Sequence, residues 1–164
     1  MIDLSVKKFR LNTLILFLFL LFSNCTSNST EGEKHIFYVN QKLLSEESYT
    51  SSNFTFNTPK GWVLVNPKDS INLVFLSPID SSMMLVNITN KFDPMGFSKP
   101  QYAEFTNNGI NFQQNVYQNS IAVVFDIKIK KNNDSLSLYY AVPRIRMNEN
   151  MTNIESSMGS LRFD

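Results

Sequence analysis

This sequence of 164 residues has few of the residue types that most often carry chemistry. It contains one histidine, His35, and one cysteine, Cys25, so it can supply neither a zinc site nor an internal disulfide. A catalytic triad would need His35 fixed beside a nucleophile, and His35 lies in a polar stretch near the N-terminus. The five glycines form no glycine-rich phosphate loop. We therefore expect no catalytic residue, no metal and no cofactor, and predict that the protein is not an enzyme.

An excess of charge of either sign is also absent, since the net charge is +1. Three basic residues, Lys7, Lys8 and Arg10, stand close together near the start of the chain, and those that follow are scattered. A nucleic-acid-binding domain needs a basic patch to neutralise phosphates. We therefore exclude nucleic acid as a partner, and the charge pattern of the domain gives no support to attraction to anionic lipid.

The only long apolar run covers residues 14–22, and it is too short to span a bilayer, which takes about 20 apolar residues. The run follows Lys7, Lys8 and Arg10 and ends at Ser23-Asn24-Cys25. A basic start followed by a short apolar stretch is the pattern of an export signal. We assign residues 1–24 to such a signal peptide.

The end of this signal, Leu21-Phe22-Ser23-Asn24-Cys25, resembles a relaxed bacterial lipobox. The resemblance implies that Cys25 is acylated and becomes the mature N-terminus, with the lipid bilayer as its partner. Phe22 and Asn24 depart from stricter lipoboxes, and such loose versions are typical of spirochaetes and related groups. Several acyl chains hold a protein stably on a membrane. The implied location is the bacterial cell envelope, at the outer membrane; the alternative is an ordinary secretory signal beside a stray cysteine.

Residues 25–52 are predicted to form a polar tether, interrupted by an apolar patch at residues 35–39. This patch has two interpretations: an edge strand packed on the domain, or an exposed segment that docks a partner through Phe37 and Tyr38. The first is favoured, because exposed apolar residues in a row are an aggregation hazard.

From residue 53 onward, the pattern is mainly that of β-strands separated by turn residues. The clearest strand covers residues 120–130, where Ile121, Phe125 and Ile129 share one face and charged residues occupy the other. The sequence predicts further strands at residues 54–56, 62–65, 73–76, 83–89 and 136–142.

Two helices are predicted between and after these strands. Ser98-Lys99-Pro100-Gln101 has the residues of a helix start, Tyr102 and Phe105 would then face the core, and Asn108-Gly109 would end the helix. Near the C-terminus, Thr152 to Glu155 has the form of a capping box. The apolar stripe that belongs to this second helix consists of Met151, Ile154, Met158 and Leu161. A stripe of this kind is typical of a helix that covers one face of a sheet.

Residues 53–164 also resemble the PsbP-like domain. The similarity lies in Phe54-x-Phe56, Pro59-x-Gly61-Trp62, the strand ending in Ser77-Pro78, the helix bearing Tyr102 and Phe105, and the final helix with Ser160-Leu161-Arg162-Phe163. Members occur among photosystem II extrinsic proteins, a Ran-binding nuclear protein and bacterial lipoproteins. The resemblance implies an α+β fold, with an antiparallel sheet of about six strands packed against one or two helices, and roles in assembly and binding without a catalytic residue. Residues 144–150 leave little space for a further strand that members usually carry.

Three functions remain open on this basis. The first is a membrane-anchored, non-catalytic module that binds an envelope protein or a host protein. The second is a carrier of a small apolar ligand held between sheet and helix, and the third is a hydrolase with a pair of carboxylates. The chain has many dispersed Asp and Glu residues, and their spacing selects no pair.

Overall fold

The structure is a computed structural model that describes residues 33–34, 36–66, 72–87 and 92–163. The predicted signal peptide, the predicted acylation site Cys25 and the lone His35 lie outside the described residues. Among the described residues, no helix is long and apolar enough to cross a membrane.

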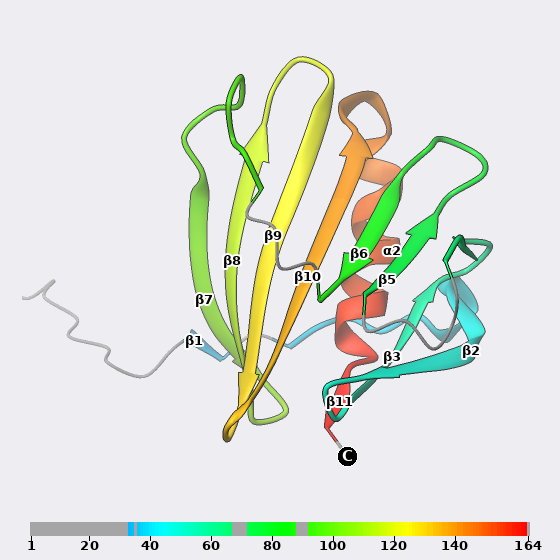
Figure 1. The fold of residues 1–164 in the computed structure, drawn as a ribbon, viewed down its shortest axis with the longest axis vertical. Coiled ribbons are helices and arrows are strands. Elements are labelled where there is room, and N and C mark those ends of the chain that lie inside the picture. Colours follow the sequence, from blue (N-terminus) through cyan, green and yellow to red (C-terminus); the bar gives the residue numbers. More distant parts are fainter. Residues whose placement is uncertain (1–32, 35, 67–71, 88–91, 164) are drawn as a thin grey trace, which may run out of the picture. The chain divides into compact units, whose positions relative to one another are not determined.

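Two β-sheets and one α-helix make up the described part of the chain (Figure 1). The larger sheet has eight strands in the order β1-β7-β8-β9-β10-β6-β5-β4, and all neighbours are antiparallel except β1 and β7. Its strands are β1 (Glu33–Lys34), β4 (Val63–Leu64), β5 (Leu73–Leu76), β6 (Met83–Val86), β7 (Gln101–Asn107), β8 (Ile110–Gln118), β9 (Ala122–Lys131) and β10 (Asp134–Pro143).

The smaller sheet has the order β11-β3-β2 and is antiparallel. It consists of β2 (Leu44–Ser51), β3 (Phe54–Pro59) and β11 (Arg162–Phe163). Two short 3-10 helices, η1 (Gln41–Leu43) and η2 (Arg144–Arg146), precede β2 and the helix α2 (Met147–Gly159). The predicted α+β class and the packing of an antiparallel sheet against a helix are confirmed, and the expected number of about six strands is too low.

Buried and exposed side chains alternate along the central strands, and the buried ones form the core. In β9 and β10, every second side chain is buried, and the buried residues of one strand stand opposite those of the other, as in the pairs Ile127–Leu138 and Phe125–Tyr140. This agrees with the strands predicted at residues 120–130 and 136–142, except that β9 begins at Ala122 and Ile121, which was predicted to share the face of Phe125, lies exposed before it. Tyr49 and Phe56 of the smaller sheet meet Phe75 of β5, so that both sheets and α2 share one apolar core.

The predicted helix over residues 98–109 is wrong, because this segment forms strand β7 and the turn into β8. Asn108 and Gly109 have φ values of +52° and +71°, which suit a two-residue hairpin turn, and Asn107 pairs with Ile110 across it. The sequence was compatible with two structures here. The three-residue spacing of Tyr102 and Phe105 suits one face of a helix, and the two-residue spacing of Phe105 and Asn107 suits one face of a strand. Pairing with β8 selected the second, so Tyr102 is exposed and Phe105 is buried.

The tether predicted over residues 25–52 is corrected in its last part. Strand β2, which was expected to be a polar linker, pairs with β3 and buries Tyr49. Its other side chains are mostly exposed, as is usual for an edge strand with one face in water, and this is why its sequence is polar. The folded domain therefore begins before residue 53.

Helix α2 begins at Met147, five residues before the predicted capping box. Pro143 ends β10, and η2 leads directly into the helix, so Thr152 lies in its interior. The predicted helical stripe is confirmed for Ile154 and Met158, which are buried; Leu161 is also buried but lies beyond the end of α2, and Met151 is exposed.

Candidate functional site

A groove of about 430 Å³ lies between α2 and the strands β7, β8 and β9. We call it the apolar groove, and its lining residues are Phe37, Ala103, Glu104, Phe105, Gln114, Phe125, Met151, Ile154, Glu155 and Met158. Its volume is within the usual range of small-molecule sites, which is about 300–1,000 Å³.

Local periodicity explains how the lining residues meet. Ala103 and Phe105 lie two residues apart on β7 and therefore point to the same face. On α2, the lining residues stand three, four and seven positions after Met151, which places them on one side of the helix. Ala103 and Met151 are exposed, so that the groove is open to solvent.

Residues 36–40 form an extended segment, which we call the strap. Phe37 of the strap makes edge-on contacts with Phe105 and Phe112, with ring centroids 5.5 and 5.4 Å apart. The backbone N–H of Tyr38 donates to Glu155 Oε1 (3.1 Å), and that of Asn40 donates to Ser156 Oγ (3.1 Å). The strap is therefore held to both the sheet and the helix.

The walls of the apolar groove carry little charge. Glu104 belongs to the lining, but its carboxylate accepts hydrogen bonds from Tyr102 Oη (2.8 Å) and Gln113 Nε2 (3.4 Å). Since these residues alternate with the inward-facing Ala103 and Phe105, the Glu104 carboxylate lies on the outer face of the sheet. Glu155 holds the strap. The groove thus presents phenyl rings, aliphatic groups and thioethers, which bind apolar groups.

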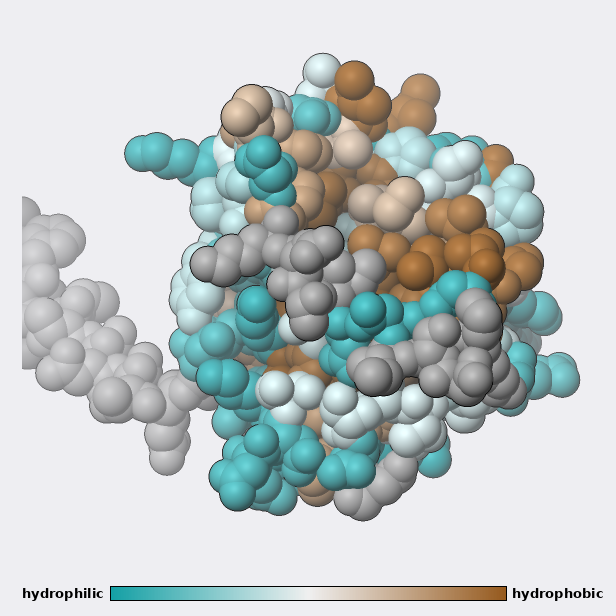
Figure 2. Space-filling view, in the orientation of Figure 1, coloured by the Kyte–Doolittle hydropathy of each residue, from teal (hydrophilic) through white to brown (hydrophobic). Residues whose placement is uncertain are grey.

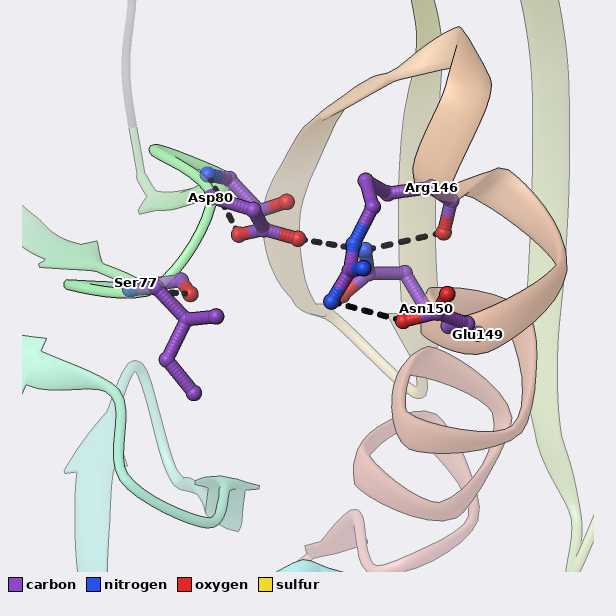
Figure 3. A network of polar contacts seen from close by, with 7 residues as sticks. Ser77, Asp80, Arg146, Glu149 and Asn150 are labelled. Carbon is purple, nitrogen blue, oxygen red and sulfur yellow. Dashed lines mark hydrogen bonds and ion pairs between the residues drawn. The ribbon is translucent and has the colours of Figure 1, made fainter.

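A smaller polar pocket of about 220 Å³ lies at the start of α2 (Figure 3). Asn150 is buried there, and its Nδ2 donates to Asp80 Oδ2 (2.9 Å) and to the Arg146 carbonyl (3.1 Å). Arg146 forms an ion pair with Glu149 at 2.7 Å. Both carboxylates of the pocket are therefore engaged with neighbouring side chains.

The acidity of Asp80 follows from these contacts. Partial burial alone would raise its pKa, but hydrogen bonds from Asn150, Ser77 and Ser82 outweigh it and lower the pKa to about 2. Asp80 is therefore ionised near neutral pH and cannot serve as a general acid. Through the hydrogen bond from Asn150, Asp80 links the β5–β6 turn to α2.

A second carboxylate with an altered acidity is Asp126 on the outer face of β9. Burial raises the pKa of Asp126, and Lys128 and Tyr139 partly oppose this effect. Asp126 and Asp80 lie on different elements, and neither is among the groups that shift the pKa of the other. Among the described residues, no three His, Cys, Asp or Glu side chains gather as a metal site would require.

The predicted docking residues differ in where they lie. Phe37 is turned inward, packs on the core and lines the apolar groove, whereas the side chain of Tyr38 is 71% exposed. Residues 36–40 form neither the edge strand that was favoured nor a fully exposed segment. A docking role for either residue stays a prediction, as does acylation of Cys25, which lies outside the described residues.

The sequence interpretation missed the apolar groove itself. Met151 and Met158 were assigned to the core, and Phe105 to a helix. The apolar stripe on α2 indicated one wall of the groove. The sequence did not reveal that the helix leaves part of the sheet uncovered.

Comparisons with known proteins reveal similarity at the level of structure. No protein-family model matches the chain, and no curated protein matches it. The fold is similar to the solution structure of cyanobacterial PsbP (CyanoP) from Synechocystis sp. PCC 6803, with 11% sequence identity and a TM-score of 0.47. That match covers 87% of this chain and 99% of the other. The similarity concerns the fold alone.

Proposed function

We propose that this protein is a non-catalytic binding module of the bacterial cell envelope, anchored through acylated Cys25 at the outer membrane. In this proposal, the apolar groove receives an apolar side chain of a partner protein, which is another envelope protein or a host protein. The observation that carries the proposal is the apolar groove, because it is open, apolar and built on rigid elements.

Binding there would follow from burial of apolar surface. Complete burial of one Leu, Ile, Phe or Met side chain contributes about 1.5–3 kcal/mol. Phe105, Phe125 and Met158 are already packed in the core, so that little ordering is needed when a ligand enters. Methionines such as Met151 adapt to ligands of different shape.

Crosslinking in cells tests this proposal. A photo-reactive phenylalanine analogue replaces Met151 in the groove, and the same analogue at the exposed Asn148, outside the groove, is the control. We expect a protein adduct from position 151 and none of the same mass from position 148.

Filling the apolar groove should abolish that adduct. Ala103→Trp places a large side chain into the groove, whereas Tyr102→Trp adds the same residue on the opposite face of β7. The adduct should disappear with Ala103→Trp and persist with Tyr102→Trp. Absence of an adduct at position 151, or its persistence in the filled groove, would refute binding at this site.

The second candidate function is a carrier of a small apolar ligand, which the groove volume of about 430 Å³ favours. Native mass spectrometry of the protein extracted from its own membrane distinguishes the two. A co-purifying small molecule that Ala103→Trp excludes and Tyr102→Trp retains would establish the carrier in place of the protein-binding module.

A further inference from the structure

Four loops gathered at one end of the domain carry exposed large hydrophobic side chains. They lie between β5 and β6, before β7, between β8 and β9, and between β10 and α2 (Figure 1). Their exposed fractions are 82%, 84%, 76% and 91% for Ile79, Met95, Ile121 and Ile145, respectively. We call these four residues the apolar tips and this end of the domain the loop end.

The opposite end of the domain has a different composition. Its three hairpin turns are Ser52-Asn53, Asn108-Gly109 and Asn132-Asn133, which contain no large hydrophobic residue. Figure 2 shows hydrophobic residues over the upper part of the view and in a second patch at its middle right, with hydrophilic residues over the lower left. The structure describes six other exposed large hydrophobic residues, Ile36, Tyr38, Val63, Val65, Tyr102 and Met151, and each is less exposed than the four apolar tips. The loop end therefore carries the four most exposed ones.

Hydrogen bonds connect these loops to one another or to the ends of neighbouring strands and of α2. The N–H of Ser98 donates to the Gln118 carbonyl (2.9 Å), and the N–H of Arg144 donates to the Ile121 carbonyl (2.8 Å). The network of Figure 3 joins the β5–β6 turn to the start of α2. The apolar tips thus project from one connected end.

We propose that the loop end inserts its apolar tips into the interfacial region of a phospholipid bilayer. The tips lie on separate loops with polar residues such as Asp80, Asn119 and Ser120 between them. A protein partner buries a contiguous apolar centre. A bilayer instead accepts separate apolar side chains, to a depth of about 5–10 Å.

Charge has a secondary part in this contact. Arg144 is exposed beside Ile145, and a guanidinium suits the geometry of a lipid phosphate. Since the net charge of the chain is only +1, burial of the apolar tips provides most of the attraction.

This inference goes beyond the proposed function and is independent of it. None of the apolar tips lines the apolar groove, and their insertion does not require an acyl chain on Cys25. The test therefore uses the full chain with Cys25→Ala, in which a newly introduced cysteine is the only one.

An environment-sensitive fluorophore on Ile145→Cys or on Asn132→Cys reports which end touches the membrane. The vesicles contain phosphatidylcholine, phosphatidylglycerol and a nitroxide-labelled lipid that quenches fluorophores in the bilayer. Both variants share the same N-terminal residues, so a difference between them reports the domain alone. We expect several-fold stronger quenching at position 145 than at position 132.

Removing two other tips should weaken the contact. Ile79→Ser with Ile121→Ser should reduce quenching at position 145, whereas Ile36→Ser with Tyr38→Ser, which alters similarly exposed residues of the strap, should not. Circular dichroism verifies that each variant is folded. Equal quenching at both ends, or a fluorophore at position 145 that stays in water, would overturn the proposal and favour a protein as the occupant of this end.

Discussion

Tyr140 is the largest side chain among those fully buried in the core, and its hydroxyl is paired. Ser157 Oγ donates its one proton to the Asn57 carbonyl (2.7 Å), so it accepts from Tyr140 Oη (3.0 Å). This chain of hydrogen bonds joins β10, α2 and β3. A buried hydroxyl with a partner stabilises the fold modestly, and one without a partner would be costly.

Tyr140→Phe should lower the free energy of unfolding by about 1 kcal/mol at neutral pH, because it removes this hydrogen bond. Burial raises the pKa of Tyr140 above its usual value of 10, and the Ser157 contact only partly opposes this. The unfolded tyrosine ionises first, so the contribution of Tyr140 to stability is fully present below pH 10 and falls as the pH rises further.

Urea unfolding between pH 8 and pH 11 measures both effects. The alkaline loss of stability should be smaller in Tyr140→Phe than in the wild type. An identical decline in both proteins would show that Tyr140 does not contribute to it.

The strap and α2 approach closely at Gly159. A Cβ at this position would lie 2.5 Å from Val39 Cγ2 and 2.8 Å from Phe37 Cβ, closer than van der Waals contact allows. Glycine is therefore needed here because the strap leaves no space for a Cβ atom. Alanine favours helix formation, so the helix and the strap make opposite demands on this residue.

Gly159→Ala should destabilise the domain by about 1–3 kcal/mol, since overpacking displaces the strap. Thr152→Ala, an exposed change in the same helix, is the matched control and should be neutral or slightly stabilising. Chemical denaturation gives both values. If Gly159→Ala proved as stable as the wild type, the strap would not be packed as described.

The hydrogen-bonded contact between the β5–β6 turn and α2 depends on an ionised Asp80. Because the folded pKa of about 2 is below the usual 3.8, this contact stabilises the fold above pH 4 and is lost as the pH falls toward 2. Asp80→Asn should cost about 1 kcal/mol at pH 6, with the difference from the wild type vanishing near pH 2.

Unfolding titrations from pH 6 to pH 2 test this, with Asn150→Ala as a second variant that removes a donor to the same carboxylate. Both variants should lose part of the acid dependence. A constant difference between Asp80→Asn and the wild type at every pH would contradict the assigned direction of the pKa shift.

The domain as a unit offers two distinct apolar surfaces, the apolar groove beside α2 and the apolar tips at the loop end. In the proposed function, both would act at a membrane, since several acyl chains on Cys25 would make attachment effectively permanent. The groove would then serve a partner while the tips set the orientation of the domain.

Cys25→Ala should abolish incorporation of labelled palmitate in cells and release the protein from the membrane fraction. Labelling compared with that of the wild type, together with fractionation of the same cells, measures this. Ser29→Ala, which lies outside the lipobox and leaves the cysteine in place, is the control. Labelling that survives in Cys25→Ala would refute acylation at this residue.

Some of the fold could be predicted from local pattern. Alternation with a period of two located β9 and β10, because burial on one face imposes that period on any half-buried strand. The spacing of Ile154 and Met158 located the face of α2 that packs on the core. The fold class followed from these elements, since a one-sided sheet and a one-sided helix must cover each other.

Other features depended on residues distant in the chain. Residues 101–107 suited a helix or a strand until β8 supplied their hydrogen-bond partners, and β2 looked like a linker because its exposed face is polar. The groove and the loop end depend on where α2 stops covering the sheet and on which turns fall at the same end. Periodicity is a property of neighbouring residues, so the sequence determined several elements and their buried faces. The surfaces on which the function is proposed were decided only by the tertiary structure, because they depend on pairing and packing between residues far apart in the chain.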